Sequence, residues 1–314
     1  MIYTLTLNPA IDRTVEVNNL KVGGLNRVES TRSDASGKGI NVSKVIRALH
    51  GNSTCLGFLG GSNGEFIRKK INQMEINESF VEINQNTRMN IKVVDKKEKH
   101  VTELNEKGPI IKEKELDSLK NLLKSQIEEG DILAISGSAP PNLSESIYRE
   151  IIELLPQNVK VILDTDGPLL EEAIKAKPYM IKPNIHEFQR LTNSESNSLR
   201  ELIDLGENVQ RNGPDTILLT MGEKGAIFFG KKEIYKIDAI PIEVKSSIGA
   251  GDAMVGGVVF SISRSKPIVE ALKVATACAA ASVSMEGTQP GPKNRVNELK
   301  SKVKIKKVDK DEIK

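Results

Sequence analysis

The stretch "SIGAGDAMVGG", residues 247–257, places an aspartate directly after Gly-Ala-Gly. If a helix begins here, the amides of Gly249, Ala250 and Gly251 lie at its N-terminus, where free N–H groups and the helix dipole favour negative charge. Asp252 in the first turn can then accept a proton from a hydroxyl group. The amides can hold charge on a transferred phosphoryl group, so the stretch predicts phosphoryl transfer. The competing interpretation is an acidic residue that only stabilises the first turn.

A second cluster, "SGKGINVSK" (36–44), offers side chains suited to an anionic sugar. Lys38 follows Gly37 and can pair with an anion, whereas Asn41 can donate and accept hydrogen bonds with sugar hydroxyls. The alternative is a turn that exposes a lysine at the start of a helix.

Further polar residues precede and follow this cluster. Asp12 lies close to the end of the first expected strand and is suited to accept hydrogen bonds from two hydroxyls. Arg27, Arg88 and Asn90 lie on polar, alternating segments. Single arginines in such segments are usually solvated, but two of them near Lys38 could bind a sugar phosphate.

The stretch "KPNIHE" (182–187) places Asn184 and Glu187 three residues apart. If a helix begins near Asn184, both side chains face the same side, and Glu187 could order a hydrated Mg²⁺ ion on nucleotide phosphates. The same spacing fits a capping box with Asn184 at the N-cap. The two interpretations are compatible.

The elements that must position these clusters alternate between short apolar runs and helical patterns. Strands are expected at 3–7, 55–60, 131–137, 159–165 and 216–222, and helices at 39–50, 64–74, 114–128, 144–155 and 198–211. This alternation predicts a mostly parallel sheet covered on both faces. The clusters then share the carboxyl edge of the sheet, where open α/β sheets bind ligands.

Two segments depart from this pattern. Residues 12–33 and 87–104 are polar, alternate in character and contain turns, so they predict a small antiparallel sheet that stands off the main body. A lid and a simple edge meander fit these segments equally well. The small, apolar composition of residues 253–263 and 268–285 predicts closely packed, buried helices.

The composition excludes several classes of protein. The 314 residues contain 38% hydrophobic and 28% charged residues with a net charge of +3, as in ordinary globular proteins. The Lys-rich end, residues 300–314, lacks interleaved aromatics, so a solvated strand or tail is favoured over a nucleic-acid arm. Cys55 and Cys278 have no metal-binding or disulfide spacing and are expected to be buried thiols. No signal peptide or membrane span is recognisable, so we expect a cytoplasmic protein without membrane or nucleic-acid partners.

Four motifs, in their order along the chain, carry a family resemblance. "GKGINVS", "KPNIHE", "TMGEKGA" and "GAGDAMVGG" resemble the PfkB (ribokinase-like) family of carbohydrate kinases over essentially the whole chain. The opening "MIYTLTLNPAIDRTVEVNNLKVGGLNRV" is similar to the hexose-phosphate kinase branch. The resemblance implies a three-layer α/β/α fold, with residues 1–314 as a single kinase domain and a small β-sheet lid.

The resemblance also implies roles for individual residues. Asp252 matches the catalytic base, and the amides of Gly249 to Gly251 match the anion hole. Residues that match nucleotide-binding positions are Lys182, Asn184, Thr220, Gly222 and Gly225, with Glu187 at the Mg²⁺ position. Residues that match the sugar-phosphate pocket are Asp12, Gly37, Lys38, Asn41, Arg88 and Asn90, to which we add Arg27.

The implied reaction is ATP- and Mg²⁺-dependent phosphorylation of the free primary hydroxyl of a ketohexose monophosphate. Fructose 1-phosphate is the first choice, with tagatose 6-phosphate and fructose 6-phosphate as alternatives. Ser36 departs from the usual GGKG pattern, and it is either strained there or adds a hydroxyl near the substrate. The sequence leaves open whether the lid forms a homodimer.

Two rival classes make different demands on the sequence. A dinucleotide oxidoreductase would need GxGxxG directly after the first strand, and residues 8–13 contain no such motif. A sugar-phosphate sensor without activity would keep the sugar pocket but lose the base or the anion hole, and this sequence keeps all of them.

Overall fold

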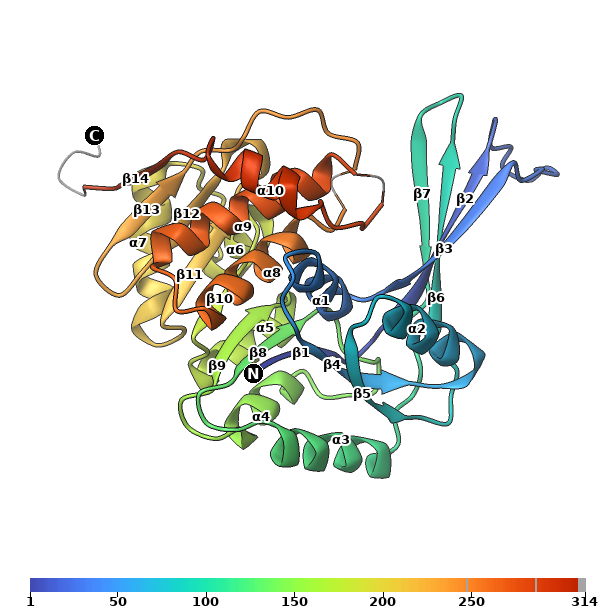
Figure 1. Cartoon of the computed structure of the whole chain (residues 1–314), viewed down its shortest axis with the longest axis horizontal. Coiled ribbons are helices and arrows are strands. Elements are labelled where there is room, and N and C mark those ends of the chain that lie inside the picture. Colours follow the sequence, from blue (N-terminus) through green and yellow to red (C-terminus); the bar gives the residue numbers. More distant parts are fainter. Residues whose placement is uncertain (247, 286, 310–314) are drawn as a thin grey trace.

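The chain forms a large sheet with helices on both faces and a small second sheet beside it (Figure 1). The computed structural model describes residues 1–246, 248–285 and 287–309. Ser247, the first residue of the stretch that carries Asp252, and residues 310–314 of the Lys-rich end lie outside the described residues.

Within the described residues, ten strands form the large sheet in the order β14-β13-β12-β11-β10-β9-β8-β1-β4-β5. In chain order they are β1 (Ile2–Thr6), β4 (Thr54–Leu59), β5 (Asn77–Glu82), β8 (Ile132–Ser136), β9 (Lys160–Asp164), β10 (Met180–Ile181), β11 (Thr216–Thr220), β12 (Ala226–Phe229), β13 (Ile234–Ile237) and β14 (Ile305–Lys307). The strands from β11 to β5 in this order pair in parallel. The pairs β11–β12, β12–β13 and β13–β14 are antiparallel, so the sheet is mostly parallel, as predicted.

Helices cover both faces of this sheet. They are α1 (Lys38–Ala48), α2 (Gly61–Gln73), α3 (Glu113–Gln126), α4 (Ile147–Leu154), α5 (Gly167–Ala173), α6 (Ile185–Thr192), α7 (Leu199–Arg211), α8 (Ala250–Ser263), α9 (Ile268–Val283) and α10 (Lys293–Lys300). Helices α1, α8, α9 and α10 lie on one side of the sheet, and α3 and α4 lie on the other (Figure 1).

The alternation of side chains along each strand divides the core in two. In β8, Leu133 belongs to the core that includes residues of α3, α4 and α7. Its neighbour Ala134 belongs to the core that includes residues of α1, α8 and α9. Strands buried on both faces therefore read as continuous apolar runs, and the predicted three-layer fold is confirmed.

The predicted strands and helices are present, with ends shifted by three residues at most. Strands β5, β10 and β12 to β14 were not predicted. β10 is only two residues long, and β5 is an edge strand whose polar residues obscure the apolar pattern.

The small sheet consists of β2 (Ala10–Val17), β3 (Ser30–Ser36), β6 (Arg88–Asp95) and β7 (His100–Asn105), in the order β3-β2-β6-β7. It projects from the main body (Figure 1). The expectation of a purely antiparallel sheet is wrong in one respect. The pairs β2–β3 and β6–β7 are antiparallel, but β2 and β6 pair in parallel. The sequence could not show this pairing, because it joins segments that are about seventy residues apart.

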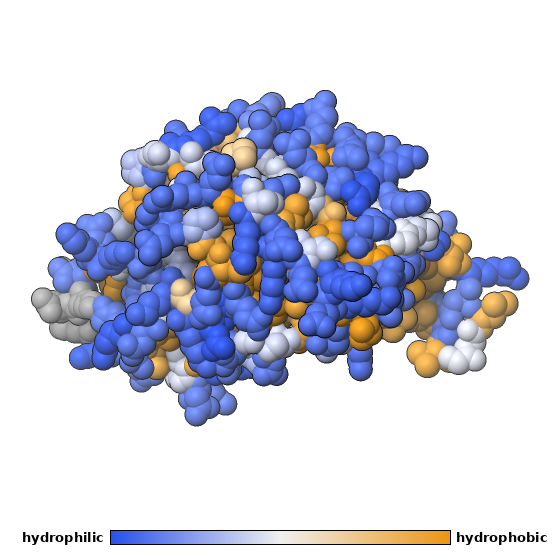
Figure 2. Space-filling view, turned by 90° about the horizontal axis from the view of Figure 1, so that it is seen from below, coloured by the Kyte–Doolittle hydropathy of each residue, from blue (hydrophilic) through white to orange (hydrophobic). Residues whose placement is uncertain are grey.

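The small sheet exposes an unusual amount of apolar surface. Val22, Leu25 and Val28 lie in the β2–β3 connection, and Val101 and Leu104 lie on β7, all more than half exposed. Figure 2 shows orange side chains where this sheet projects at the right of the view. Scattered single apolar residues are normal on a surface, but several on one small sheet are typical of an interaction site.

The remaining composition-based expectations concern the thiols and the membrane. Cys55 and Cys278 are both free and buried, as predicted. Among the described residues, none of the helices combines the length and the apolar character needed to span a bilayer.

Candidate active site

The sequence clusters meet at the carboxyl ends of the parallel strands. Asp164 is the last residue of β9, Lys182 directly follows β10, and Thr220 is the last residue of β11. Parallel strands bring such residues to one edge, which is where open α/β sheets bind ligands.

Asp252 lies in the first turn of α8, and its side chain is buried. Gly249 is the N-cap of this helix and has a φ of 84°, in the left-handed region that glycine adopts without strain. Gly249, Ala250 and Gly251 therefore surround the helix N-terminus, as the sequence predicts. The helix dipole and the free amides at this point favour negative charge.

The surroundings of Asp252 adjust its acidity. Burial and the nearby carboxylate of Asp164 raise the pKa of Asp252 to about 6. The opposing influences are the hydrogen bond from Asn41 and the positive charges of Lys38 and Lys182. Asn41 Nδ2 donates to Asp252 Oδ2 at 2.8 Å, and both residues are buried. Near neutral pH the carboxylate is thus ionised and able to accept a proton.

Asp164 holds two lysines together beside Asp252. Its side chain is 2% exposed, and its Oδ1 lies 3.2 Å from Lys182 Nζ and 3.5 Å from Lys38 Nζ. Burial acts to raise the pKa of Asp164, yet the two lysines hold it below its ordinary value. Asp164 in turn raises the pKa of Lys38. The sequence prediction missed Asp164, although an acidic residue at the end of the apolar run "VILD" was a usable signal.

Lys182 also lies beside the predicted anion hole. A Cβ atom on Gly251 would be 3.2 Å from Lys182 Nζ, so the ammonium group closely approaches the backbone there. A cation and free backbone amides at one place form a site for an anion such as a phosphoryl group.

Asn184 and Glu187 form a capping box at the start of α6. Asn184 Oδ1 accepts hydrogen bonds from the backbone N–H groups of His186 and Glu187, at 2.9 and 3.0 Å. Glu187 Oε2 accepts from the N–H of Asn184 at 2.8 Å. The structural interpretation is confirmed, and the metal-binding interpretation stays a prediction.

The donor set around Glu187 suits a largely hydrated metal ion. The described residues contain no cluster of three or more His, Cys, Asp or Glu side chains that could hold a metal by themselves. Glu187 is half-buried and close enough to raise the pKa of Lys38. A single carboxylate at the rim of a phosphate site fits Mg²⁺, which usually keeps several waters and binds phosphate oxygens.

The predicted nucleotide loop follows β11. Thr220 forms an isolated parallel bridge with Asn184, which brings the two motifs into contact. Gly222 and Gly225 have φ values of 59° and 87°. At Gly225 a Cβ atom would lie 2.0 Å from the Ile237 carbonyl oxygen, so glycine is required there for packing. The nucleotide-binding roles of Thr220, Gly222 and Gly225 remain predictions.

Asp12 lies within β2 and already receives three hydrogen bonds. Its Oδ1 accepts from Asn90 Nδ2 at 3.0 Å. Its Oδ2 accepts from Ser36 Oγ at 2.9 Å and from Lys92 Nζ at 3.2 Å. A carboxylate has about four lone-pair sites, so roughly one is left for a ligand, where we expected two.

The structure decides between the two interpretations of Ser36. Ser36 is the last residue of β3 and does not have a positive φ, so it is not strained. Its contribution is the hydroxyl group that donates to Asp12. Gly37, which follows, has a φ of 134°, and a Cβ atom there would meet the Thr6 side chain at 2.7 Å. Glycine thus lets α1 start directly over the end of β1.

The two arginines have different places. Arg88 donates to the carbonyl oxygen of Asn8 at 3.0 and 3.2 Å and to that of Glu106 at 2.9 Å. It joins the β1–β2 connection to the segment after β7. Burial lowers the pKa of its guanidinium.

Arg27 is not brought to the other predicted residues within one chain. It is exposed in the β2–β3 connection, which lies at the tip of the small sheet (Figure 1). Five residues of extended strand separate Asp12 from the end of β2 at Val17, which is about 17 Å. The sequence prediction of Arg27 as a substrate ligand is therefore not supported by the geometry of a single chain.

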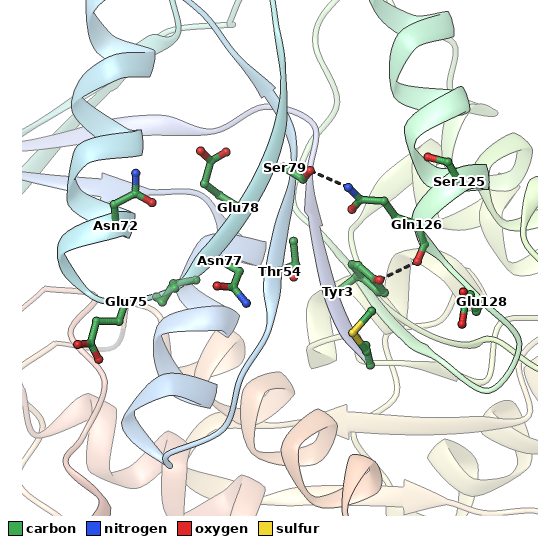
Figure 3. A pocket seen from close by; sticks show the side chains of 12 residues that line it. Tyr3, Thr54, Asn72, Glu75, Asn77, Glu78, Ser79, Ser125, Gln126 and Glu128 are labelled. Atoms are coloured by element: carbon green, nitrogen blue, oxygen red, sulfur yellow. Dashed lines mark hydrogen bonds between the residues drawn. The ribbon is translucent and has the colours of Figure 1, made fainter.

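A hollow lies at the opposite, amino end of the sheet (Figure 3). It has a volume of about 860 Å³ and is lined by the starts of β1, β4 and β5 and by residues near the ends of α2 and α3. Several of its polar groups pair with one another or with a neighbouring arginine. Tyr3 donates to the Gln126 carbonyl oxygen at 2.7 Å, Gln126 donates to Ser79 Oγ at 2.8 Å, and Glu78 pairs with Arg68 at 2.6 Å.

Comparisons with known proteins show the family to which the chain belongs. The model of the pfkB family of carbohydrate kinases matches residues 5–295. A 1-phosphofructokinase from Borreliella burgdorferi is 38% identical over 90% of this chain and 91% of its own length. A tagatose-6-phosphate kinase from Staphylococcus epidermidis is 34% identical over 88% of this chain and 90% of its own.

Among solved structures, phosphofructokinase-2 from Escherichia coli in complex with substrates and products superposes with a TM-score of 0.90. The match covers 96% of this chain and 98% of that one, at 25% identity. The range that the family model matches contains the positions of the predicted site residues.

Proposed function

The chain belongs to the pfkB family of carbohydrate kinases, and we propose that it transfers the γ-phosphoryl group of ATP to the free primary hydroxyl of a ketohexose monophosphate. Fructose 1-phosphate is the proposed substrate and fructose 1,6-bisphosphate the product. The observation that carries the proposal is the buried Asp252, held by Asn41 at the N-terminus of α8 beside two lysines.

Asp252 is the proposed base. The substrate oxygen forms a bond to the γ-phosphorus as the bond from that phosphorus to the bridging oxygen of ADP breaks. The hydroxyl proton passes to the Asp252 carboxylate. A carboxylate with a pKa of about 6 is ionised at neutral pH and is a better proton acceptor than an ordinary aspartate.

The amides of residues 249–251 and the ammonium group of Lys182 face the transferred phosphoryl group in this proposal. Charge on that group is spread over three oxygens, and preorganised donors lower the barrier without having to reorient. Asp164 holds the buried ammonium group of Lys182 by an ion pair at 3.2 Å, so this group needs little further ordering when the substrates bind.

ATP is the expected phosphoryl donor of this family. We place its phosphates near Lys182, Asn184 and Thr220, with Gly222 and Gly225 shaping the loop beside them. Glu187 would hold Mg²⁺ through water molecules. When bound, Mg²⁺ would supply positive charge to the nucleotide phosphates.

The sugar phosphate is proposed to bind between the small sheet and α1. Asp12, Asn90 and Asn41 offer hydrogen-bonding groups for hydroxyls, with the backbone at Gly37 close by, while Lys38 and Arg88 offer positive charge. The preference for fructose 1-phosphate rests on the 1-phosphofructokinase relatives. The tagatose-6-phosphate kinase relatives make tagatose 6-phosphate the second candidate. Fructose 6-phosphate is the third.

A coupled assay of ADP release tests the function and the substrate together. With ATP and Mg²⁺ present, fructose 1-phosphate is expected to give the highest kcat/KM of the three sugar phosphates. If it gave the lowest, the choice of substrate would be wrong. If ADP release did not increase with any of them, while the sugar phosphates still bound, a sensor would replace the kinase.

We also propose that the small sheet is a lid over the sugar and the interface of a homodimer. The support is the group of exposed apolar side chains on β7 and in the β2–β3 connection. The mass of one chain is 34.4 kDa, and light scattering is expected to give twice this mass. Leu104→Lys is expected to shift the measured mass towards that of the monomer. A wild-type protein that stays monomeric at tens of micromolar would contradict the dimer.

A further inference from the structure

Lys44 is a buried lysine that the proposed mechanism does not use. It lies on α1, one turn after Asn41, and only 3% of it is exposed. Lysines are almost never buried to this extent unless their charge is compensated. Its surroundings should therefore show what the ammonium group does.

The ammonium group of Lys44 donates hydrogen bonds to two acceptors. One is the backbone carbonyl oxygen of Ala35, near the end of β3. The other is Asn41 Oδ1, at 3.2 Å. The amide of Asn41 then donates through Nδ2 to Asp252 Oδ2 at 2.8 Å. Three buried polar side chains thus form one line from α1 to the first turn of α8.

The cation decides which way the amide of Asn41 faces. A carboxamide has an acceptor end and a donor end, and the two differ little in shape. With an ammonium group on one side and a carboxylate on the other, only one orientation makes both hydrogen bonds. The reversed amide would point its oxygen at the Asp252 carboxylate and its N–H groups at Lys44, and both contacts would be repulsive.

We propose that Lys44 is a positioning residue for phosphoryl transfer, which fixes the amide of Asn41 so that it holds the Asp252 carboxylate in place. This role rests on the proposed function, because it requires Asp252 to be the base. By its hydrogen bond to Ala35, Lys44 also ties the end of the lid strand β3 to the same line.

Burial and nearby carboxylates act in opposite directions on the pKa of Lys44. Burial lowers the pKa of Lys44, and the carboxylates of Asp34, Asp12 and Asp252 oppose this. Asp34 and Asp12 lie on the lid strands β3 and β2, and Asp252 lies on α8. The ammonium group is thus surrounded by carboxylates from the three elements that meet at the sugar end of the site.

Removal of the ammonium group should affect turnover more than binding. Asn41 would lose the interaction that fixes the orientation of its amide. The hydrogen bond from this amide to Asp252 would then no longer be held in one geometry. Displacement of a catalytic group by about 1 Å can cost a factor of about a hundred in rate. The nucleotide motifs at Asn184 and Thr220 lie on other elements, so binding of ATP should not change.

The test compares Lys44→Met with Lys44→Arg in the full-length protein. Lys44→Met is expected to lower kcat by about ten- to a hundredfold, with the KM for ATP unchanged within about twofold. The acid limb of the pH profile of kcat should move to higher pH, because Asp252 loses a nearby positive charge and a fixed donor. Lys44→Arg keeps the charge and is expected to recover part of the rate.

Lys120→Met is the matched control. Lys120 pairs with Glu150 at 2.9 Å between α3 and α4, on the other side of the sheet. This variant loses a lysine and an ion pair but is expected to keep the wild-type kcat and pH profile. If Lys44→Met does not fold, Lys44→Gln is measured in its place. Glutamine removes the positive charge but keeps a hydrogen-bond donor.

Three outcomes separate the inference from the proposed function. If Asp252→Asn is inactive while Lys44→Met has the wild-type kcat and pH profile, the positioning role is wrong and the kinase mechanism stands. If Lys44→Met melts at a lower temperature but its kcat and acid limb are unchanged, Lys44 is only structural, and the inference is also overturned. If Asp252→Asn keeps the wild-type kcat, the proposed base is wrong.

Discussion

The two ends of the large sheet carry charged groups in opposite ways. At the carboxyl end, Asp252, Asp164 and Lys182 are buried, and two lysines share the Asp164 carboxylate. At the amino end, the hollow of Figure 3 is lined by residues such as Glu75, whose side chain is 76% exposed and pairs with Arg47. The first arrangement brings several buried charges together, whereas Glu75 and Glu78 beside the hollow each pair with an arginine.

The difference shows that the volume of a hollow is a poor guide to function. The hollow at the amino end measures about 860 Å³, but its polar groups pair with one another or face water. Asp252, Asp164 and Lys182 at the carboxyl end are buried, so each acts on its neighbours with much less screening. This is the arrangement that stabilises charge in a transition state.

The largest contrast is expected between single carboxylates at the two ends. Asp252→Asn should lower kcat by about 10²- to 10⁴-fold, because the substrate hydroxyl loses its proton acceptor. Glu78→Gln, beside the hollow at the amino end, should leave kcat unchanged. Steady-state ADP release measures both, and circular dichroism checks that both variants fold. A near-normal kcat for Asp252→Asn would remove it from the role of base.

Stability should show the same contrast. Asp164→Asn should lower the free energy of unfolding by about 3 to 5 kcal/mol, because it leaves the buried ammonium group of Lys182 without its partner. Glu75→Gln breaks only an exposed pair with Arg47 and should cost less than about 1 kcal/mol. Urea titrations of both variants give these values. Similar small losses would mean that the buried pairs are not needed for stability.

The pH dependence of kcat should reveal the buried carboxylate. Because the pKa of Asp252 is raised to about 6, the carboxyl becomes protonated below that pH and can no longer accept a proton. We expect kcat to fall by about tenfold per pH unit below this pKa and to level off above about pH 7. Calorimetric binding of both substrates at each pH separates this effect from their own ionisation. A kcat that stays constant down to pH 5 would contradict the assignment.

The smallest effect is expected at Ser36. Ser36→Gly removes one donor from Asp12 and frees an acceptor site for a sugar hydroxyl. Its KM values for fructose 1-phosphate and tagatose 6-phosphate should change relative to each other by about two- to tenfold, as for one hydrogen bond. Ser79→Gly makes the same change in a strand at the amino end, and it should alter neither value. An unchanged ratio in Ser36→Gly would exclude a role in specificity.

Most of the layout could be predicted from the sequence. Apolar runs such as 131–137 identified the central strands, and motifs after several of these runs had to meet at one edge of a parallel sheet. The capping box at Asn184 followed from spacing alone, because it lies within one helical turn. These features depend on local pattern, which a single sequence contains.

The remaining features depend on contacts between distant segments. The parallel pairing of β2 with β6 and the hydrogen bond from Ser36 to Asp12 join residues that no local pattern relates. In the sequence, Lys44 does not differ from other helical lysines. Its hydrogen-bonded connection to Asp252 depends on the packing of α8 against α1. Arg27 is the opposite case. Its residue type and segment suited a substrate ligand, but it lies at the far tip of the small sheet, away from the other predicted residues.

Hydrogen exchange measured with and without fructose 1-phosphate and a nonhydrolysable ATP analogue tests most directly which end of the sheet is the active site. We expect slower exchange in peptides that cover residues 36–44 and 248–255, at the carboxyl end. Peptides that cover residues 72–79 and 125–128, around the hollow of Figure 3, should exchange at the same rate in both samples. Protection confined to the amino end, with no change at residues 248–255, would contradict the account.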